Sequence, residues 1–321
     1  MLRVLLGKEI NNVVLEVSSH ALSQNRVDSI VFDSVGFTNL TLDHLDYHKS
    51  LDNYFNDKKK LFGLIKEGNN PLILSDTDYG QAICKDYPNS KKVSLKNADA
   101  DYFCADISIT KNGISGVMHS KDSSVQIDST LIGRYNLENI LLASSIALEI
   151  GIQQSSIEQG IKNCDYIDGR NENISEPEWP DIIIDYAHTP DAYRNMLSSI
   201  KEIYPDKTMK VLFGAGGNRD QSKRSEMAKA VQEFADVAYL VPDNPRFEDI
   251  NKINNDVILG FSKDMFEVFD NRKHGLLAAL KNLDSDDILI IFGKGNEKFQ
   301  EINGEKLYYS DREIIEEFYA N

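Results

Sequence analysis

The chain has 321 residues, of which 41% are hydrophobic and 27% charged, a balance typical of a globular protein with room for two domains. Its 35 basic and 51 acidic residues give a formal net charge of −16, which disfavours a surface for nucleic acid or anionic membrane. A local phosphate site built from backbone amides and one or two cations remains compatible with that charge. Three widely spaced cysteines, and the lack of a signal segment or an apolar run of ~20 residues, predict a cytoplasmic protein.

The first apolar runs predict a short core strand at residues 13–17 (VVLEV) and a second strand at residues 30–37 (IVFDSVGF). A buried parallel strand normally lies among others, and little sequence precedes residue 13. We therefore expect the chain to begin inside a domain.

The segment from Thr38 to Lys60 is the densest group of ionisable residues. It places Asp43, His44, Asp46 and His48 within six positions. Imidazole and carboxylate groups at this spacing indicate either a hydrated loop or a metal and acid–base site. Glu16, at the end of the apolar run upstream, favours the second interpretation.

The following patterns predict alternating helices and strands, with an Asn112-Gly113 hairpin turn inside a group of short strands. Helices are expected at residues 51–64, 79–87, 133–152 and 155–163, and strands at residues 71–78 and within 102–131.

A polar, proline-bearing stretch at residues 166–180 predicts a domain boundary. Beyond it, near-continuous Val/Ile/Leu strands alternate with helices, which predicts a Rossmann-like, doubly wound α/β domain of mostly parallel strands. Polar clusters follow four of these strands, and ligands bind at such carboxyl ends. The clusters are DYAHTPDA (185–192), GAGGNRD (214–220), PDNPRFED (242–249) and GKGNE (293–297).

Each cluster is weak evidence alone. The glycine loop at residues 214–224 (GAGGNRDQSKR) lacks the third glycine of a dinucleotide fingerprint, and its basic residues could form a solvated helix face. DNPR (243–246) is a turn that also offers an arginine fork for a carboxylate, and GKGNE is equally ambiguous. Several clusters meeting at one sheet edge would favour a ligand site.

Taken in order, the motifs resemble those of the Mur ligases, in particular the type that adds meso-diaminopimelate to UDP-N-acetylmuramoyl-alanyl-glutamate. The resemblance covers essentially the whole chain. It rests on the segments EVSSHAL, TNLTLDHLDYH, GRYNLEN, DGRNE, IDYAHTPDA, GAGGNRD, DNPR, GKGNEKFQ and YSDRE.

The resemblance implies an ATP-dependent amide-bond ligase of peptidoglycan synthesis that works through an acyl phosphate. It implies Mg²⁺ at Glu16 and His44, with Lys58 as a carbamylated lysine whose added carboxylate also meets the metal. The remaining implied contacts are the muramoyl-dipeptide at Ser18, Gln24 and Arg26, and ATP at Asn136, Asn139, Arg170 and Asp185.

The incoming amino acid would be read by Arg219, Asn244, Arg246, Gly293 and Glu297. Arginine forks suit the carboxylates of diaminopimelate, and a glutamate can pair with an ammonium group. Lysine has no distal carboxylate, so Arg246 favours diaminopimelate. Asn296 departs from the histidine usual in the family, which bears on local geometry, and Gln221-Ser222 is a minor variation.

The sequence contains no G-x-x-G-K-[ST] phosphate-binding loop, since Gly7-Lys8 and Gly293-Lys294 are followed by Glu9 and Gly295. The resemblance thus implies a central ATPase domain at residues 1–168, incomplete at its N-terminus, and a C-terminal domain at residues 169–321. We expect a monomer with little ligase activity by itself. The alternatives are a non-catalytic module that binds an amino acid or a partner, and a related ligase that adds glutamate to a folate or a peptide polymer. An oxidoreductase is a distant third.

Overall fold

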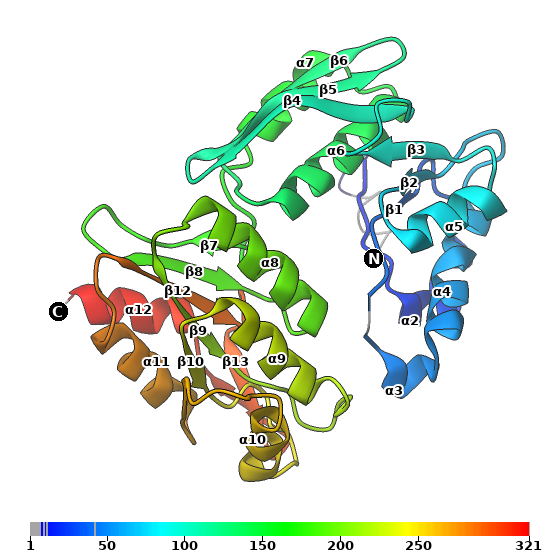
Figure 1. The fold of residues 1–321 in the computed structure, drawn as a ribbon. Coiled ribbons are helices and arrows are strands. Elements are labelled where there is room, and N and C mark those ends of the chain that lie inside the picture. Colours follow the sequence, from blue (N-terminus) through cyan, green and yellow to red (C-terminus); the bar gives the residue numbers. More distant parts are fainter. Residues whose placement is uncertain (1–7, 9, 11, 42, 321) are drawn as a thin grey trace.

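The computed structural model describes residues 8, 10, 12–41 and 43–320, which form two separate six-stranded sheets covered by helices (Figure 1). This confirms the predicted α/β class. Within these residues, no helix combines the length and apolar character needed to cross a bilayer.

The first sheet has the order β1-β2-β3-β4-β5-β6, parallel from β1 to β4 and antiparallel from β4 to β6. The Asn112-Gly113 turn between β4 and β5 is confirmed: Thr110 pairs with Gly113, whose φ of +135° suits glycine. The strands are β1 (Gly36–Phe37), β2 (Leu72–Leu74), β3 (Lys91–Ser94), β4 (Tyr102–Thr110), β5 (Gly113–Ser120) and β6 (Ser124–Ser129).

Helices cover both faces of this sheet, because its parallel strands are apolar on both sides. Leu72 and Leu74 pack in a core with Leu137 and Leu141 of α6, whereas Ile73 between them packs with Tyr54 of α4. The helices are α2 (Ser19–Ser23), α3 (Leu45–His48), α4 (Leu51–Lys59), the 3₁₀ helix η1 (Lys60–Leu64), α5 (Asp78–Asp86), α6 (Arg134–Glu149) and α7 (Gln154–Lys162).

The core strand predicted at residues 13–17 is wrong. These residues have no regular structure; Val14 is fully exposed and Val13 is exposed as well. No backbone hydrogen bond joins residues 12–17 to another described segment, so their apolar side chains have no neighbouring strand to pack beside. The strand predicted at residues 30–37 is shorter than expected, with β1 and one isolated bridge between Phe32 and Ile65.

The second sheet has the order β11-β10-β9-β12-β8-β7, in which only β7 runs antiparallel. This confirms the predicted doubly wound, mostly parallel arrangement, and a separate hairpin follows it. The strands are β7 (Glu172–Asn173), β8 (Asp181–Asp185), β9 (Thr208–Phe213), β10 (Val237–Leu240), β11 (Phe266–Val268) and β12 (Asp287–Phe292), with β13 (Phe299–Ile302) and β14 (Glu305–Tyr308) in the hairpin.

The strands of this second sheet are buried on both faces. Ile288 and Ile290 of β12 pack in a core with α8, α9 and α10, whereas Leu289 and Ile291 pack in the core that contains α11 and α12 (Figure 1). The helices are α8 (Pro190–Ile203), α9 (Arg224–Phe234), α10 (Ile250–Ile258), α11 (Arg272–Lys281) and α12 (Asp311–Ala320).

The arrangement brings the four predicted polar clusters to one edge of the second sheet. Strands β8, β9, β10 and β12 are mutually parallel, and a polar cluster follows the carboxyl end of each. Ligands of doubly wound sheets bind at this edge.

Candidate active site

His44 and Lys58 both lie against the ring of Tyr54. His44 precedes α3 with a left-handed φ of +57°, and its ring centroid is 5.8 Å from that of Tyr54. The Lys58 Nζ is 5.3 Å from the Tyr54 centroid and 6.0 Å from that of Phe37, and it donates to the carbonyl of Asn39 at 3.4 Å. Of the three residues predicted to bind Mg²⁺, the structure therefore brings His44 and Lys58, but not Glu16, to one aromatic side chain.

Burial lowers the pKa of the Lys58 ammonium group, although the charges of Glu16 and Asp43 act in the opposite direction. Burial likewise lowers the pKa of His44, against the effect of Asp43. Both shifts favour the neutral side chains. A neutral amine is the form that can take up carbon dioxide, and a neutral imidazole is the form that binds metal.

The unmodified residues do not complete a metal site. Glu16 is exposed, and an ammonium group cannot be a metal ligand. In the described ranges, no three His, Cys, Asp or Glu side chains are grouped so that they could hold a metal. A Mg²⁺ site here therefore depends on a carbamate at Lys58, which would add the oxygen ligands that this hard cation prefers.

His48, at the end of α3, connects this helix to α2 and α4. Its Nδ1 lies 2.8 Å from Asp57 Oδ2 in α4, and its Nε2 lies 2.9 Å from Ser19 Oγ in α2. The ring also stacks on Tyr54, with centroids 5.0 Å apart. His48 is buried, whereas Asp46 is exposed.

Asp43 does more than support its loop, because it contacts the second α/β unit. Its Oδ1 is 3.3 Å from Lys223 Nζ and its Oδ2 is 3.8 Å from His188 Nε2. Burial opposes ionisation of Asp43, but Lys223 and His44 outweigh it and hold the pKa below its usual range. Asp43 is therefore a carboxylate that links the metal-side segment to the loops after β8 and β9.

The three residues expected to hold the muramoyl-dipeptide surround α2. Ser18 is the N-cap of this helix, with its Oγ accepting from the Ala21 N–H at 3.2 Å. Gln24 donates to the Tyr47 hydroxyl at 3.2 Å, and Arg26 is exposed. Arg26 and part of Gln24 thus remain accessible to a ligand.

The two asparagines expected near adenine lie on α6. Asn136 is buried and donates to the Ile132 carbonyl at 2.9 Å, whereas Asn139 is exposed. Both line a largely apolar cavity of about 390 Å³ between α6 and α7. The Ile132 carbonyl also accepts from Asn171 Nδ2 at 2.9 Å, which ties the start of α6 to the segment after residue 168.

Arg170 and Asp185, the other two residues expected to bind ATP, lie at the end of β8. The Arg170 guanidinium lies 4.8 Å from the Tyr186 ring centroid. Asp185 accepts backbone N–H groups of Asn171 at 2.7 Å and Ala187 at 2.6 Å. Burial raises the pKa of Asp185 despite these two hydrogen bonds.

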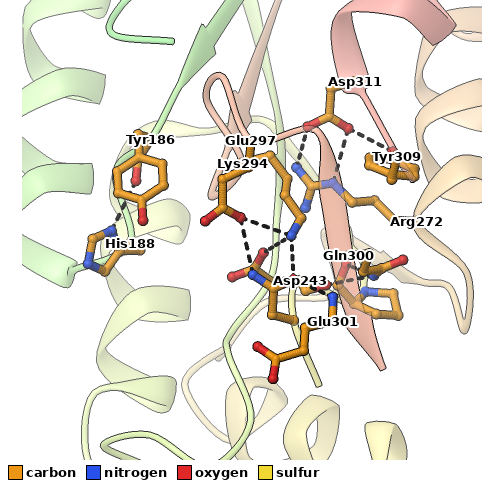
Figure 2. Close-up of polar contacts among 12 residues, drawn as sticks. Tyr186, His188, Asp243, Arg272, Lys294, Glu297, Gln300, Glu301, Tyr309 and Asp311 are labelled. Atoms are coloured by element: carbon orange, nitrogen blue, oxygen red, sulfur yellow. Dashed lines mark hydrogen bonds and ion pairs between the residues drawn. The ribbon is translucent and has the colours of Figure 1, made fainter. Parts of the chain in front are cut away.

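Asn244 and Glu297 meet at a buried lysine that the sequence interpretation did not single out. Lys294 Nζ lies 2.5 Å from Asn244 Oδ1, 3.2 Å from Glu297 Oε2 and 3.3 Å from Asp243 Oδ1 (Figure 2). Asn244 Nδ2 in turn donates to Glu297 Oε2 at 3.2 Å. The two residues expected to read the amino acid thus form one connected group.

Arg246 lies near Asn244, but part of its guanidinium is bound to other residues of the protein. Its Nε pairs with Glu301 Oε2 at 3.1 Å, and its Nη1 donates to the Gly217 carbonyl at 2.8 Å. Its backbone has a left-handed φ of +54° and bridges to Ile302. The guanidinium is therefore held over the glycine loop, with Nη2 making no hydrogen bond to the described residues.

Gly293 and Arg219 complete the expected set. Gly293 has a φ of +105°, and its N–H donates to the Asp185 carbonyl at 3.1 Å. It therefore connects the residues expected to read the amino acid to those expected to bind ATP. Arg219 is exposed. Burial and the charge of His48 lower the pKa of the His20 imidazole, and Arg219 contributes to that shift. Asn296, the departure from the family pattern, is exposed and donates to Asp168 Oδ2 at 3.3 Å.

A second buried ion pair lies behind Lys294. Arg272 binds both carboxylate oxygens of Asp311, at 3.0 and 2.7 Å (Figure 2). It also donates to the Phe292 carbonyl at 2.8 Å. In the sequence, the YSDRE motif, to which Asp311 belongs, could have indicated this pair. Lys294 could have been singled out because it stands between two glycines directly after an apolar strand.

Two family models match this chain. The Mur ligase middle domain matches residues 1–147, and the domain described as Mur ligase, glutamate ligase domain, matches residues 169–295. Similar proteins include the UDP-N-acetylmuramoyl-L-alanyl-D-glutamate–2,6-diaminopimelate ligases of Nostoc sp. and Fusobacterium nucleatum, each 37% identical over 94% and 96% of this chain. The chain spans 61% and 64% of their lengths.

Solved structures agree with these matches. A structure of a UDP-N-acetylmuramoyl-L-alanyl-D-glutamate–2,6-diaminopimelate ligase aligns with a TM-score of 0.59 and 30% identity over 95% of this chain and 64% of its own. A pseudomurein peptide ligase type C from Methanothermus fervidus has a TM-score of 0.69 and 17% identity over 94% of this chain and 66% of its own, and shows likeness of fold alone. The chain belongs to the Mur ligase family.

Proposed function

We propose that the chain provides the metal-side and amino-acid-binding parts of a cytoplasmic, ATP-dependent ligase of peptidoglycan synthesis. The ligase adds meso-diaminopimelate to UDP-N-acetylmuramoyl-L-alanyl-D-glutamate, and the chain is monomeric. Residues 1–168 are the ATPase portion, and residues 169–321 bind the incoming amino acid and part of ATP. The names of the relatives support the substrate assignment.

The chemistry proposed is amide formation through an acyl phosphate, for which ATP with Mg²⁺ supplies the phosphoryl group and charge neutralisation when bound. Ser18 at the N-cap of α2, and Gln24 and Arg26 at and beyond its C-cap, orient the dipeptide. Arg170 and Asp185 bind the nucleotide opposite Asn136 and Asn139. Positioning and electrostatics carry such a transfer, because the protein forms no covalent intermediate.

The observation that carries this proposal is the convergence of Asn244, Arg246 and Glu297 at the carboxyl edge of the second sheet. Arg246 offers a cation for a distal carboxylate, and Glu297 offers an anion for an ammonium group. Asp43 holds the metal-side segment against the loops of the same edge.

Calorimetric titration of the 321-residue chain tests the amino-acid assignment. We expect meso-diaminopimelate to bind at least about tenfold more tightly than L-lysine or L-glutamate, because lysine has no distal carboxylate and glutamate has no distal ammonium group. Tighter binding of glutamate would favour the folate or peptide-polymer ligases. Equal binding of lysine would contradict the role of Arg246.

We also propose that the 321 residues alone turn over slowly or not at all. They contain no G-x-x-G-K-[ST] segment to hold the ATP phosphates. Phosphate release that requires ATP, the dipeptide substrate and diaminopimelate together, measured with the purified chain, would overturn this part of the proposal.

A further inference from the structure

Lys294 has no solvent exposure. It follows Gly293 at the end of β12, and its Nζ donates to Asn244 Oδ1 and Glu297 Oε2 and forms an ion pair with Asp243 Oδ1. An ammonium group only donates, and its contacts here are oxygens of the protein itself. Because Lys294 is fully buried, it does not bind a substrate directly.

Lys294 fixes which way the Asn244 amide points. Asn244 Oδ1 accepts from Lys294 Nζ and, at 2.8 Å, from the backbone N–H of Glu301. With both donors on the oxygen side, Nδ2 must face Glu297 Oε2 at 3.2 Å. Reversing the amide would set its NH₂ group against two donors.

Lys294 also holds Glu297 in place. The Glu297 Oε2 atom takes both the lysine and the asparagine contact, and Oε1 takes part in neither. One cation among the carboxylates of Asp243 and Glu297 leaves the group with a net negative charge. Such a group is suited to a second, external ammonium group.

A neighbouring buried ion pair holds the strand end that carries Lys294. Arg272 donates to the Phe292 carbonyl, two residues before Lys294, while its other contacts bind Asp311 (Figure 2). Both Arg272 and Asp311 are buried. The lysine is thus attached to a rigid strand end.

We propose that Lys294 is a positioning residue that orients Asn244 and Glu297 to bind an ammonium group of the incoming amino acid. This inference rests on the proposed function of the same site. Lys294 acts through its neighbours, so it should govern discrimination between ligands with and without an ammonium group, and not affinity for carboxylates.

The test compares meso-diaminopimelate with pimelate, which has the same two terminal carboxylates and no ammonium group. For the unmodified chain, calorimetry should give at least about tenfold tighter binding of diaminopimelate, the size expected for hydrogen bonds to a charged group. In Lys294→Met this ratio should fall to about one, while the affinity for pimelate changes by less than about threefold.

Lys298→Met is the matched control, because Lys298 is an exposed lysine four residues further on and pairs with Glu313 at 3.6 Å. It should keep the unmodified ratio. An unchanged ratio in Lys294→Met would overturn the inference alone. Failure of the unmodified chain to prefer diaminopimelate would overturn the proposed function and the inference with it.

A measurement on the unmodified chain covers the case in which Lys294→Met does not fold. With ¹⁵N-labelled lysine, the buried Lys294 ammonium group should give a slowly exchanging signal. Diaminopimelate should shift this signal, and pimelate should not. Equal shifts with both ligands would contradict the positioning role.

Discussion

Asp43 and Lys223 are separated by 180 residues in sequence, yet their Oδ1 and Nζ atoms lie 3.3 Å apart. Both side chains are largely buried, with exposed fractions of 15% and 12%. Asp43 directly precedes His44, and Lys223 precedes α9 in the glycine-loop segment. One ion pair therefore connects the segment that contains His44 to the second α/β unit, which carries Asn244 and Glu297.

Asp43→Asn should loosen this connection. The change leaves Lys223 with only a neutral partner in a largely buried place, at a cost of about 1–3 kcal/mol in the free energy of unfolding. Backbone hydrogen exchange should become faster at residues 43–48 and 219–224. Asp46→Asn, at an exposed position of the same segment, is the control, and unchanged exchange in Asp43→Asn would contradict the linking role.

Lys58→Ala should abolish turnover while leaving the fold largely intact. In a longer protein that supplies a phosphate-binding loop, we expect ADP release to fall by at least about 100-fold, because the carbamate that completes the metal ligands is lost. Lys59→Ala is the matched control, since Lys59 pairs with Asp86 away from Tyr54. Rescue of Lys58→Ala by small carboxylates would support the carbamate role, and undiminished activity would contradict it.

Arg246→Ala should weaken the use of diaminopimelate much more than the use of ATP. Loss of the carboxylate partner should raise KM for diaminopimelate about 10- to 100-fold, with a small change in KM for ATP. Arg194→Ala is the control, because Arg194 lies on α8 and pairs with Glu226 and Glu233 of α9. Equal losses for both substrates would show that Arg246 acts through its structural contacts with Glu301 and Gly217.

Glu248 should make stability depend on acidic pH. Two hydrogen bonds from the buried Arg224, at 2.8 and 2.7 Å, lower the pKa of Glu248 from 4.5 to about 2. The group binds protons more weakly when folded, so it stabilises the protein above the unfolded pKa and loses this effect as the pH falls towards 2.

Denaturant unfolding of Glu248→Gln measures this contribution. The unmodified chain should be more stable than the variant by on the order of 2 kcal/mol near neutral pH, and the difference should shrink between about pH 5 and pH 2. Glu267→Gln, at an exposed position of β11, should show no such difference. A difference that is constant with pH would contradict the assignment.

The second sheet could be predicted from sequence because its strands are continuous apolar runs, such as Ile182–Ile184, each followed by a helical pattern. Strands β3 and β11 were missed because the segments Lys91–Ser94 and Phe266–Val268 are short and partly charged. The apolar run at residues 13–17 misled the prediction, because strand propensity is realised only beside a partner strand. The β13–β14 hairpin had a signal in Asn303-Gly304 that was not used.

The candidate site was predictable where it follows strand ends, as with Asn244 and Glu297 after β10 and β12. Sequence order placed these segments at one edge. It could not show that Lys294 is fully buried, because lysine is rarely buried and its partner Asn244 lies 50 residues away. Nor could it show the contact between Asp43 and Lys223, which depends on how the two sheets meet.

The two hydrogen bonds of His48 assign the proton on its ring. A carboxylate only accepts, so Asp57 requires the proton of the neutral ring on Nδ1. Nε2 is then a lone-pair acceptor that takes the hydroxyl hydrogen of Ser19. Neither ring nitrogen of His48 is then free to bind a cation, which leaves His44 as the histidine of this segment that can bind a metal. Because the Ser19 hydroxyl donates its hydrogen to His48, it can only accept a hydrogen bond from a ligand that binds beside Ser18.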